Sequence, residues 1–421
     1  MADHESPRAA KVLGLPAWHA ARYQRLSEPR SNESCPNEPH PNGYRPASAF
    51  DRFAARVDAA TPAHRDRAVD ALRALAILGV VLGHWLITAL TATGGGLRTV
   101  SPLAERPALT PVSWVLQTLA VFFLVGGYGA AKGLRPGVAP FAWAKQRLAR
   151  LWRPVPLLLI VWVPAALALW LGGFPPGTVR TLVKLVLSPL WFLIVYGVLT
   201  ALAPLVSVAW FRYRWRLPVA AVAATALVDV VRFGLDGPAW LGWATVLTGW
   251  LVPFSLGVAW AHGAFAGVRA AAFLLVGGAL ATVGLVLWAG YPASMVGVPG
   301  AEVSNLNPPT LAAVAFGLAQ TGLALLLRGP LTRWTRRPRA WATVAAANLG
   351  AMTVFLWHQT AMMSVTVVLL LAAGPLPGLH DCPDDPGWPL ARLLWLPAFA
   401  LALALAGLAA LAHGRRRSER S

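Results

Sequence analysis

The sequence predicts an all-α polytopic membrane protein, a bundle of about ten transmembrane helices with both the N- and C-termini in the cytoplasm. The 421 residues are 57% hydrophobic and only 13% charged, with a mean hydropathy of +0.56, which is too apolar for an ordinary soluble protein. The apolar residues occur in runs of about twenty, the length at which a helix crosses a bilayer. Lys and Arg residues are distributed unequally between the two sides of these runs. This composition excludes a disordered chain, a collagen-like fibre and a secreted disulfide scaffold.

Ten apolar stretches define the predicted helices. They cover residues 69–90, 112–131, 154–173, 186–209, 217–231, 240–261, 268–289, 309–327, 343–373 and 391–412. The fifth stretch is short for a bilayer, and the ninth is long enough for a helix that tilts or kinks.

The basic residues between these stretches orient the bundle. If the N-terminus is inside, the inner connections hold 19 basic residues: Lys132, Arg135, Lys145, Arg147, Arg150, Arg153, Arg212, Arg214, Arg216, Arg269, Arg328, Arg333, Arg336, Arg337, Arg339, Arg415, Arg416, Arg417 and Arg420. The outer connections hold five: Arg98, Arg106, Arg180, Lys184 and Arg232. Lys and Arg near helix ends stay on the cytoplasmic side, so this bias supports ten helices with both ends inside. The formal net charge of +19 is thus mainly a matter of topology, and we expect no nucleic-acid partner.

Three regions follow from this pattern. Residues 1–67 hold no apolar segment long enough for a signal peptide and mix Arg, Pro, Ser, Asn and Glu, so we expect a disordered cytoplasmic N-terminal tail. Residues 68–413 form the ten-helix membrane domain, and residues 414–421 form a basic cytoplasmic C-terminal tail. We expect a multi-pass protein of the cell's inner (plasma) membrane.

The first predicted helix holds Asp70, Arg73 and His84 in an apolar background. A charge near the bilayer centre costs a few kcal/mol, so each of these residues is a candidate for function. At about 100° per residue, the steps from Arg73 to His84 leave a net rotation of about 20° and a rise of about 16 Å, which places both on one face. Asp70 lies one turn before Arg73 and is placed to pair with it. Asp70 and Arg73 also fit a simple anchor at the inner interface, whereas the depth of His84 favours a functional role.

Other polar residues of the predicted helices are candidates for the same region. His358 and Gln359 lie well inside the ninth helix, and His358 reaches a depth similar to that of His84, so the two histidines are placed to face one cavity. Asp229 falls in the outer half of the fifth helix, and Trp191 lies toward the outer end of the fourth. For Asp229 the alternative is a helix-end charge in a short span.

The segment AWAKQRLARLWRPVP before the third helix is basic, partly amphipathic and free of acidic residues. Arg147 and Arg150 are three residues apart, which puts them on one helix face and suits bidentate binding of phosphate. An interfacial helix that meets anionic lipid explains the same pattern equally well.

Taken in order, these residues resemble the acyltransferase-3 family of bacterial membrane-bound acyltransferases, over about residues 65–412. Arg73 and His84 match the family's most diagnostic pattern, an arginine, ten residues and a histidine in the first transmembrane helix. Arg147 and Arg150 match its Arg-x-x-Arg pair on the cytoplasmic side before the third helix. Softer matches are VFFLVGGYGA, PLWFL, PFSLGVAWA and VFLWHQ.

The chain departs from the family pattern at two points. Gly126 stands where the family often has Ser, so no hydroxyl is available there. Pro154 follows the paired arginines one residue later than expected, which makes Arg153 a rival for the second arginine.

The resemblance implies transfer of an acyl group, often acetyl, from acyl-coenzyme A to a hydroxyl of a glycan, a glycolipid or a related envelope or secreted acceptor. Under this hypothesis Arg147 and Arg150 hold the phosphates of coenzyme A, and the thioester arm passes Arg73. His84 then acts as general base on the acceptor hydroxyl, or as a transient acyl carrier.

Three residues are expected in supporting roles: His358, Trp191 and Asp229 would orient His84 or line the acceptor side. Acyl-CoA is a co-substrate, so no permanently bound cofactor is expected, and the histidines lack the spacing of metal ligands. The expected partners are acyl-CoA, the acceptor and the lipid bilayer.

Two other classes of function remain open. Ten helices with buried His and Asp residues also suit a proton-coupled transporter or flippase of a lipid or sugar. A scaffold in an envelope-assembly complex is the third hypothesis, and in that case His84 would be dispensable.

Overall fold

The computed structural model describes residues 48–134 and 137–418, with side chains up to residue 409, and it confirms the predicted fold class. Within these residues, ten helical segments are long and apolar enough to cross a membrane. They span Arg67–Ile87, Pro107–Gly133, Pro140–Leu171, Pro176–Ala201, Arg216–Gly234, Ala239–Ala261, Val268–Trp288, Leu311–Trp334, Ala351–Ala373 and Trp388–Ala409. Their number equals the number of apolar stretches in the sequence, so the protein is a multi-pass membrane protein.

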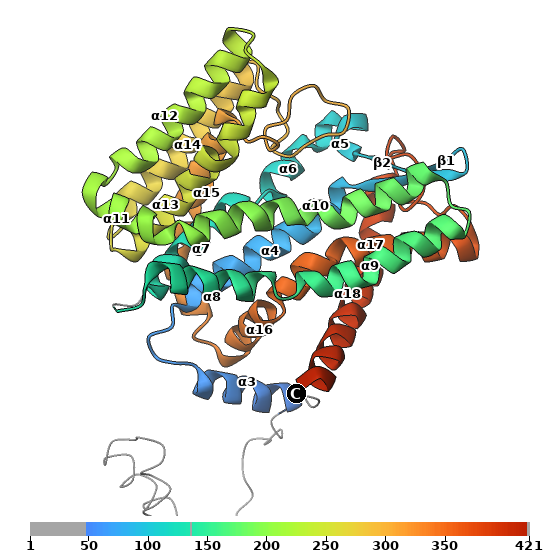
Figure 1. Ribbon diagram of the computed structural model, residues 1–421, viewed down its shortest axis with the longest axis horizontal. Coiled ribbons are helices and arrows are strands. Elements are labelled where there is room, and N and C mark those ends of the chain that lie inside the picture. The colour runs from blue at the N-terminus through green and yellow to red at the C-terminus, as the bar shows by residue number, and fades with distance from the viewer. Residues whose placement is uncertain (1–47, 135–136, 419–421) are drawn as a thin grey trace, which may run out of the picture. The chain divides into compact units, whose positions relative to one another are not determined.

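The described elements follow one another in a simple order (Figure 1). They are α3 (Ala49–Ala60), α4 (Arg67–Ile87), β1 (Ala89–Thr93), β2 (Gly96–Val100), α5 (Pro102–Glu105), η1 (Pro107–Leu109), α6 (Thr110–Leu116), α7 (Leu119–Gly133), α8 (Pro140–Trp152), α9 (Val155–Leu171), α10 (Pro176–Ala201), α11 (Ala203–Tyr213), α12 (Arg216–Asp229), η2 (Val230–Gly234), η3 (Ala239–Gly242), α13 (Trp243–Ala261), α14 (Val268–Trp288), α15 (Leu311–Trp334), α16 (Pro338–Leu349), α17 (Ala351–Ala373) and α18 (Trp388–Ser418).

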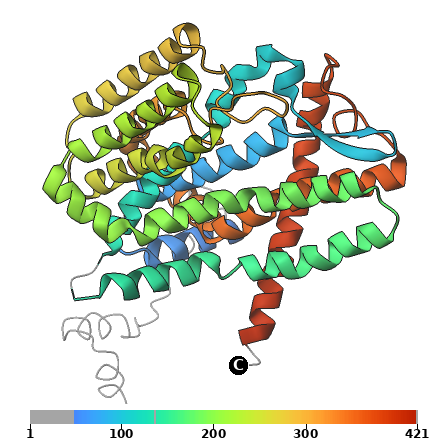
Figure 2. The same ribbon diagram turned by 45° about the horizontal axis from the view of Figure 1, so that its top comes forward.

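Helix α4 lies inside the bundle, in contact with α6, α7, α15, α16, α17 and α18 (Figures 1 and 2). It begins at a favourable N-cap, because the Asp66 side chain accepts a hydrogen bond from the backbone N–H of Val69. The helix is then continuous to Ile87, so Arg73 and His84 keep the common face that their spacing predicts.

Two of the spans are interrupted: the second breaks at Gln117 and Thr118, and the third at Arg153 and Pro154. The ninth predicted stretch, residues 343–373, was expected to tilt or kink, and it is divided at Gly350, where α16 ends and the ninth span, α17, begins. A break in a membrane span frees backbone groups that must find partners within the protein. At the second span, Gln320 donates to the Gln117 carbonyl and Thr118 donates to the carbonyl of Ala76.

A β-hairpin follows α4 where the sequence predicted that the first helix would run on to residue 90. Strands β1 and β2 are antiparallel, with Ala89 opposite Val100, and they lie at the end of α4 away from α3 (Figure 1). The helix ends early because Gly94 and Gly95, both at positive φ, form the two-residue turn that a hairpin requires.

The predicted N-terminal tail, residues 1–67, lies largely outside the described residues, but part of it is helical. Helix α3 packs against α16, and the Trp341 indole N–H donates to the Thr61 hydroxyl at 2.6 Å. The amphipathic sequence AFDRFAARVDAA explains why this segment folds on the bundle. The basic C-terminal tail begins inside α18, whose backbone is helical to Ser418.

Arg392 of α18 fixes the end of α4 that carries His84. Its side chain is 1% exposed, and its guanidinium donates to the carbonyls of Trp85 at 2.7 Å, Thr88 at 2.8 Å and Gly378 at 3.0 Å. The last carbonyls of a helix have no partner within the helix, so one buried guanidinium satisfies two of those on α4 and one in the loop before α18.

We expect Arg392→Met to lower the stability of the detergent-purified protein by roughly 2–4 kcal/mol, because it leaves buried carbonyls without donors. The measurement is the thermal unfolding midpoint. Arg339→Gln is the control, because it removes only an exposed ion pair with Asp51 and should change the midpoint little. An Arg392→Met protein as stable as wild type would show that these hydrogen bonds contribute no net stability.

Candidate active site

Two cavities lie along α4, one beside Arg73 and one beside His84. The first, here called the arginine cavity, has a volume of about 270 Å³ and is lined by Arg73, Arg147 and Arg150 among sixteen residues. The second, the histidine cavity, has a volume of about 230 Å³, and its polar lining includes His84 and Gln117. Of the two predicted catalytic residues, Arg73 thus shares a cavity with the predicted donor-binding residues Arg147 and Arg150, whereas His84 lines the other cavity.

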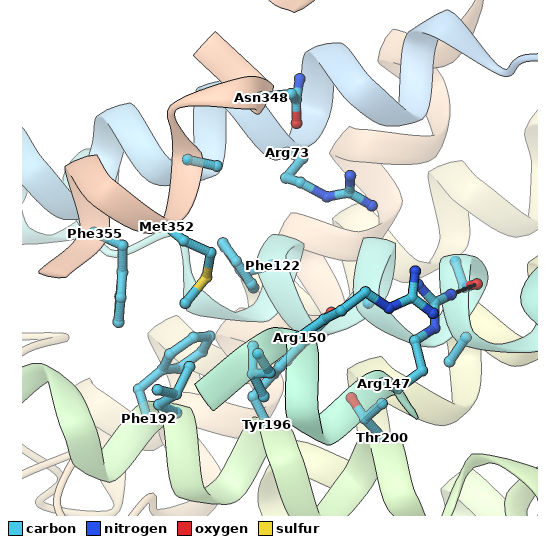
Figure 3. A pocket seen from close by; sticks show the side chains of 16 residues that line it. Arg73, Phe122, Arg147, Arg150, Phe192, Tyr196, Thr200, Asn348, Met352 and Phe355 are labelled. Atoms are coloured by element: carbon cyan, nitrogen blue, oxygen red, sulfur yellow. Dashed lines mark hydrogen bonds between the residues drawn. The ribbon is translucent and has the colours of Figure 1, made fainter. Parts of the chain in front are cut away.

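The arginine cavity is electropositive, since none of its lining residues is acidic. Figure 3 shows the three guanidinium groups gathered at one end of the cavity, with Phe122 and Phe355 at the other. Arg147 is held in place, because its Nη2 donates to the carbonyl of Gly129 at 2.9 Å. Arg150 is exposed, which leaves its guanidinium available to a ligand. This end of the cavity can hold an anion with several oxygen atoms.

Asp70 and Arg73 pair as their spacing predicts. Arg73 Nη1 lies 3.5 Å from Asp70 Oδ1, and Asp70 also binds Arg65, with 2.6 Å between Arg65 Nε and Asp70 Oδ2. The shorter contact to Arg65 occupies the carboxylate more fully than Arg73 does. Arg73 therefore keeps hydrogen-bonding capacity toward the arginine cavity.

In the histidine cavity, His84 is surrounded by groups from α17. The ring of His358 lies 5.1 Å from that of His84 between centroids, and the Gln359 side-chain amide is 2.9 Å from His84 Nδ1. His358 Nδ1 lies 2.7 Å from the carbonyl of Phe355, whereas its Nε2 has no partner among the described residues. The two histidines lie side by side, as their similar depths predict, but only His84 lines the cavity, so the expectation that both face it is wrong. With Nδ1 engaged by Gln359, His84 presents Nε2 for chemistry.

The two cavities share a wall of aromatic rings. Phe192 of α10 and Phe355 of α17 line both cavities, and their ring centroids are 5.2 Å apart. We call this pair the aromatic partition. These two rings therefore border both the space that holds the three arginines and the space that holds His84.

Comparison with known families settles which class of protein this is. The sequence model of the acyltransferase-3 family, described as an acyltransferase domain, matches residues 66–414. The chain belongs to this family. Comparisons with curated proteins and with solved structures give no match. The protein is therefore a membrane acyltransferase, and the resemblance predicted from its motifs is confirmed.

Five of the predicted site residues of the acyltransferase line one of the two cavities, and His358 and Asp229 do not. Arg73, Arg147 and Arg150 line the arginine cavity, and His84 and Trp191 line the histidine cavity. His358 is fully buried behind His84 and does not line either cavity.

Both departures from the family pattern have a structural explanation. Arg153 is exposed and lines neither cavity, so Arg150 is the better match for the second arginine of the pair. At Gly126, a Cβ atom would lie 2.5 Å from the ring of Tyr196 and 3.1 Å from its hydroxyl. Glycine leaves room there for Tyr196, whose hydroxyl occupies the space that a serine side chain would need.

Asp229 lies apart from both cavities and supports the start of α15. Its Oδ2 accepts from the backbone N–H of Leu311 at 2.7 Å and from the Tyr291 hydroxyl at 3.0 Å. Burial and the adjacent Asp229 carboxylate raise the pKa of Tyr291 far above its ordinary value, so this hydroxyl remains a donor in the physiological range. These contacts favour the alternative considered for Asp229, a structural charge at the end of a short helix, over a place on the acceptor side of the site.

Tyr196 and Arg392, which the sequence did not single out, lie at or beside the site, and so does Gln117, which the sequence placed toward the outer end of the second helix without a role. Gln117 and Tyr196 line the cavities, and Arg392 holds the end of α4. The sequence could have pointed to Arg392, because it is a charged residue just inside the tenth apolar stretch. Tyr196 carried none, because a tyrosine in an apolar helix is ordinary core composition.

We expect Asp229→Ala to lower the thermal unfolding midpoint, by the equivalent of about 1–3 kcal/mol, because it strands the Leu311 N–H and the Tyr291 hydroxyl. Asp229→Asn should lower it less, since it keeps one acceptor oxygen. Glu302→Ala, an exposed carboxylate in the neighbouring loop, is the control. If Asp229→Ala melts like wild type but loses activity, the structural role is wrong.

Proposed function

We propose that this acyltransferase moves an acyl group, with acetyl as the expected one, from cytoplasmic acyl-CoA to a hydroxyl of a glycan, a glycolipid or a related envelope or secreted acceptor. The observation that supports this proposal is the arrangement of the two cavities. An acid-free arginine cavity adjoins a histidine cavity across the aromatic partition, along one helix. An anionic donor and a proton-accepting imidazole are what CoA-dependent acyl transfer needs.

The arginine cavity fits the phosphates of the donor. Guanidinium groups match phosphate oxygens in bidentate geometry, and Arg73, Arg147 and Arg150 provide three of them with no competing carboxylate in the lining. The sidedness of the basic residues in the sequence places this cavity toward the cytoplasm, where acyl-CoA is made. The rise of about 16 Å from Arg73 to His84 is a distance that a long thioester arm can cover.

His84 is the general base of the proposed reaction. The acceptor oxygen attacks the thioester carbonyl carbon while its proton passes to His84 Nε2. The tetrahedral intermediate then collapses, the C–S bond breaks, and the thiolate of coenzyme A takes the proton from His84. For Nε2 to accept the proton, Nδ1 must carry the ring N–H, so the Gln359 amide orients the imidazole with its oxygen accepting from Nδ1–H. A covalent acyl-His84 intermediate is the alternative, and it requires the donor to react before the acceptor binds.

We expect His84→Ala to reduce acyl transfer from labelled acetyl-CoA in membranes by about 10²–10⁴-fold, the usual contribution of a general base. His64→Ala is the matched control, because His64 is exposed in the loop before α4 and far along the helix from His84. A His84→Ala protein that folds, inserts and keeps wild-type transfer would show that His84 is not catalytic.

We expect Arg147→Ala combined with Arg150→Ala to raise the KM for the acyl-CoA donor by about 10-fold or more, since each lost charge-assisted hydrogen bond is worth about 1.5–3 kcal/mol. Arg153→Ala is the matched control: it removes a neighbouring arginine that lines neither cavity. An unchanged KM, or an equal effect of Arg153→Ala, would favour a helix that binds anionic lipid. Uptake of a substrate by vesicles without donor consumption would favour the transporter hypothesis.

A further inference from the structure

The break in the second span lies directly beside His84. Helix α6 ends at Leu116 and α7 begins at Leu119, with Gln117 and Thr118 between them in non-helical conformations. A Cβ atom at Gly79 would lie 2.5 Å from the Thr118 hydroxyl oxygen, and one at Gly83 would lie 3.5 Å from the Leu116 side chain. These two glycines of α4 let the broken span approach the turn that carries His84.

The N-terminus of α7 has no cap. Thr118 occupies the N-cap position, but its side chain makes no capping hydrogen bond and donates instead to the carbonyl of Ala76 at 2.7 Å. The first N–H groups of a helix, here on Leu119, Ala120 and Val121, have no acceptor within the helix. They carry the positive end of the helix dipole, and Thr118 and Leu119 line the histidine cavity.

Gln117 provides an independent reason to look for a ligand here. It is 4% exposed and lines the histidine cavity, yet its side-chain Oε1 has no hydrogen-bond partner among the described residues. The backbone of Gln117 is bound on both sides, because its N–H donates to the carbonyl of Ser113 and its carbonyl accepts from Gln320. A buried Oε1 without a donor costs free energy, and no partner among the described residues fixes the orientation of this amide. The bound backbone keeps its NH₂ group, a donor of two hydrogen bonds, at the cavity.

We propose that the break at Gln117 and Thr118 is the oxyanion site of the acyltransferase. This inference rests on the proposed acyl transfer. The side-chain amide of Gln117, with its NH₂ group turned to the cavity, and the free N–H groups of the first turn of α7 donate hydrogen bonds to the thioester oxygen of the acyl group.

The donors act at the point where charge develops. When the acceptor oxygen bonds to the thioester carbon, the π electrons of the C=O bond move to its oxygen, which becomes an anion, and the acceptor proton goes to His84. When the C=O bond re-forms, the C–S bond breaks and the thiolate leaves as coenzyme A with that proton. Donors fixed in a site without bulk water stabilise the anion without reorganising.

The test uses Gln117→Met, an unbranched substitution that removes the amide and keeps the length of the side chain. We expect the turnover number for acetyl transfer to fall about 10²–10³-fold, with the KM for acetyl-CoA and the thermal stabilisation by coenzyme A unchanged. Gln117→Asn should retain part of the activity. Gln146→Met is the matched control, because Gln146 is exposed and lines neither cavity.

A spectroscopic measurement tests the contact without turnover. In the His84→Ala protein, the carbonyl stretch of bound [1-¹³C]acetyl-CoA should lie at lower frequency than in water, and His84→Ala with Gln117→Met should move it back. Wild-type turnover in Gln117→Met, or an equal carbonyl frequency in both proteins, would overturn the oxyanion site and leave the acyl transfer intact. A fall in thermal midpoint together with loss of donor stabilisation would assign Gln117 a structural role instead. A wild-type protein without any transfer would overturn the proposed function itself, and this inference with it.

Discussion

Inside a bilayer, water is not present to hydrogen-bond a free backbone N–H or C=O group, so the protein must supply the partner. Much of the structure around α4 follows from this constraint. Side chains bind exposed backbone groups at two places beside this helix: Arg392 binds the last carbonyls of α4, and Gln320 binds the carbonyl at the break in the second span. Asn348, near the junction of α16 and α17, adds a contact to the carbonyl of Asp70 within α4. These polar contacts hold the helices that frame both cavities in one arrangement.

The charged groups inside the bundle divide into two kinds by what they contact. Arg392 donates to three backbone carbonyls, and Asp229 accepts from a backbone N–H and from the Tyr291 hydroxyl, so both serve the fold. Arg147 contacts one carbonyl and Arg150 only the backbone of its own helix, so most of their hydrogen-bonding capacity faces the arginine cavity. A charged residue within the membrane therefore indicates function only when its hydrogen-bond partners are known. Asp229 was a candidate site residue in the sequence, yet its partners give it a structural role.

The parts of the site that depend on one helix or on depth could be predicted from the sequence. Helical period places Arg73 and His84 on one face, and counting from the inner helix ends places His358 level with His84; both hold in the structure. The break at Gln117 could not be predicted, because it lies within one apolar run and depends on Gln320, 203 residues away. The partners of Asp229 are also distant in sequence, since Tyr291 lies 62 residues away and Leu311 lies 82 residues away. Local sequence patterns predict which segments span the membrane and which residues share a helix face. The contacts of Gln117 and Asp229 form only when distant helices pack together.

The aromatic partition also has a consequence for the cell's energy supply. A continuous column of water through the arginine and histidine cavities would let protons flow down the membrane potential, and each charge crossing 100 mV dissipates about 2.3 kcal/mol. Phe192 and Phe355, which line both cavities, offer such a column no hydrogen bonds. If a ligand spans both cavities, these rings must close again behind it to keep a water column from persisting, which limits how wide and how long the partition can open.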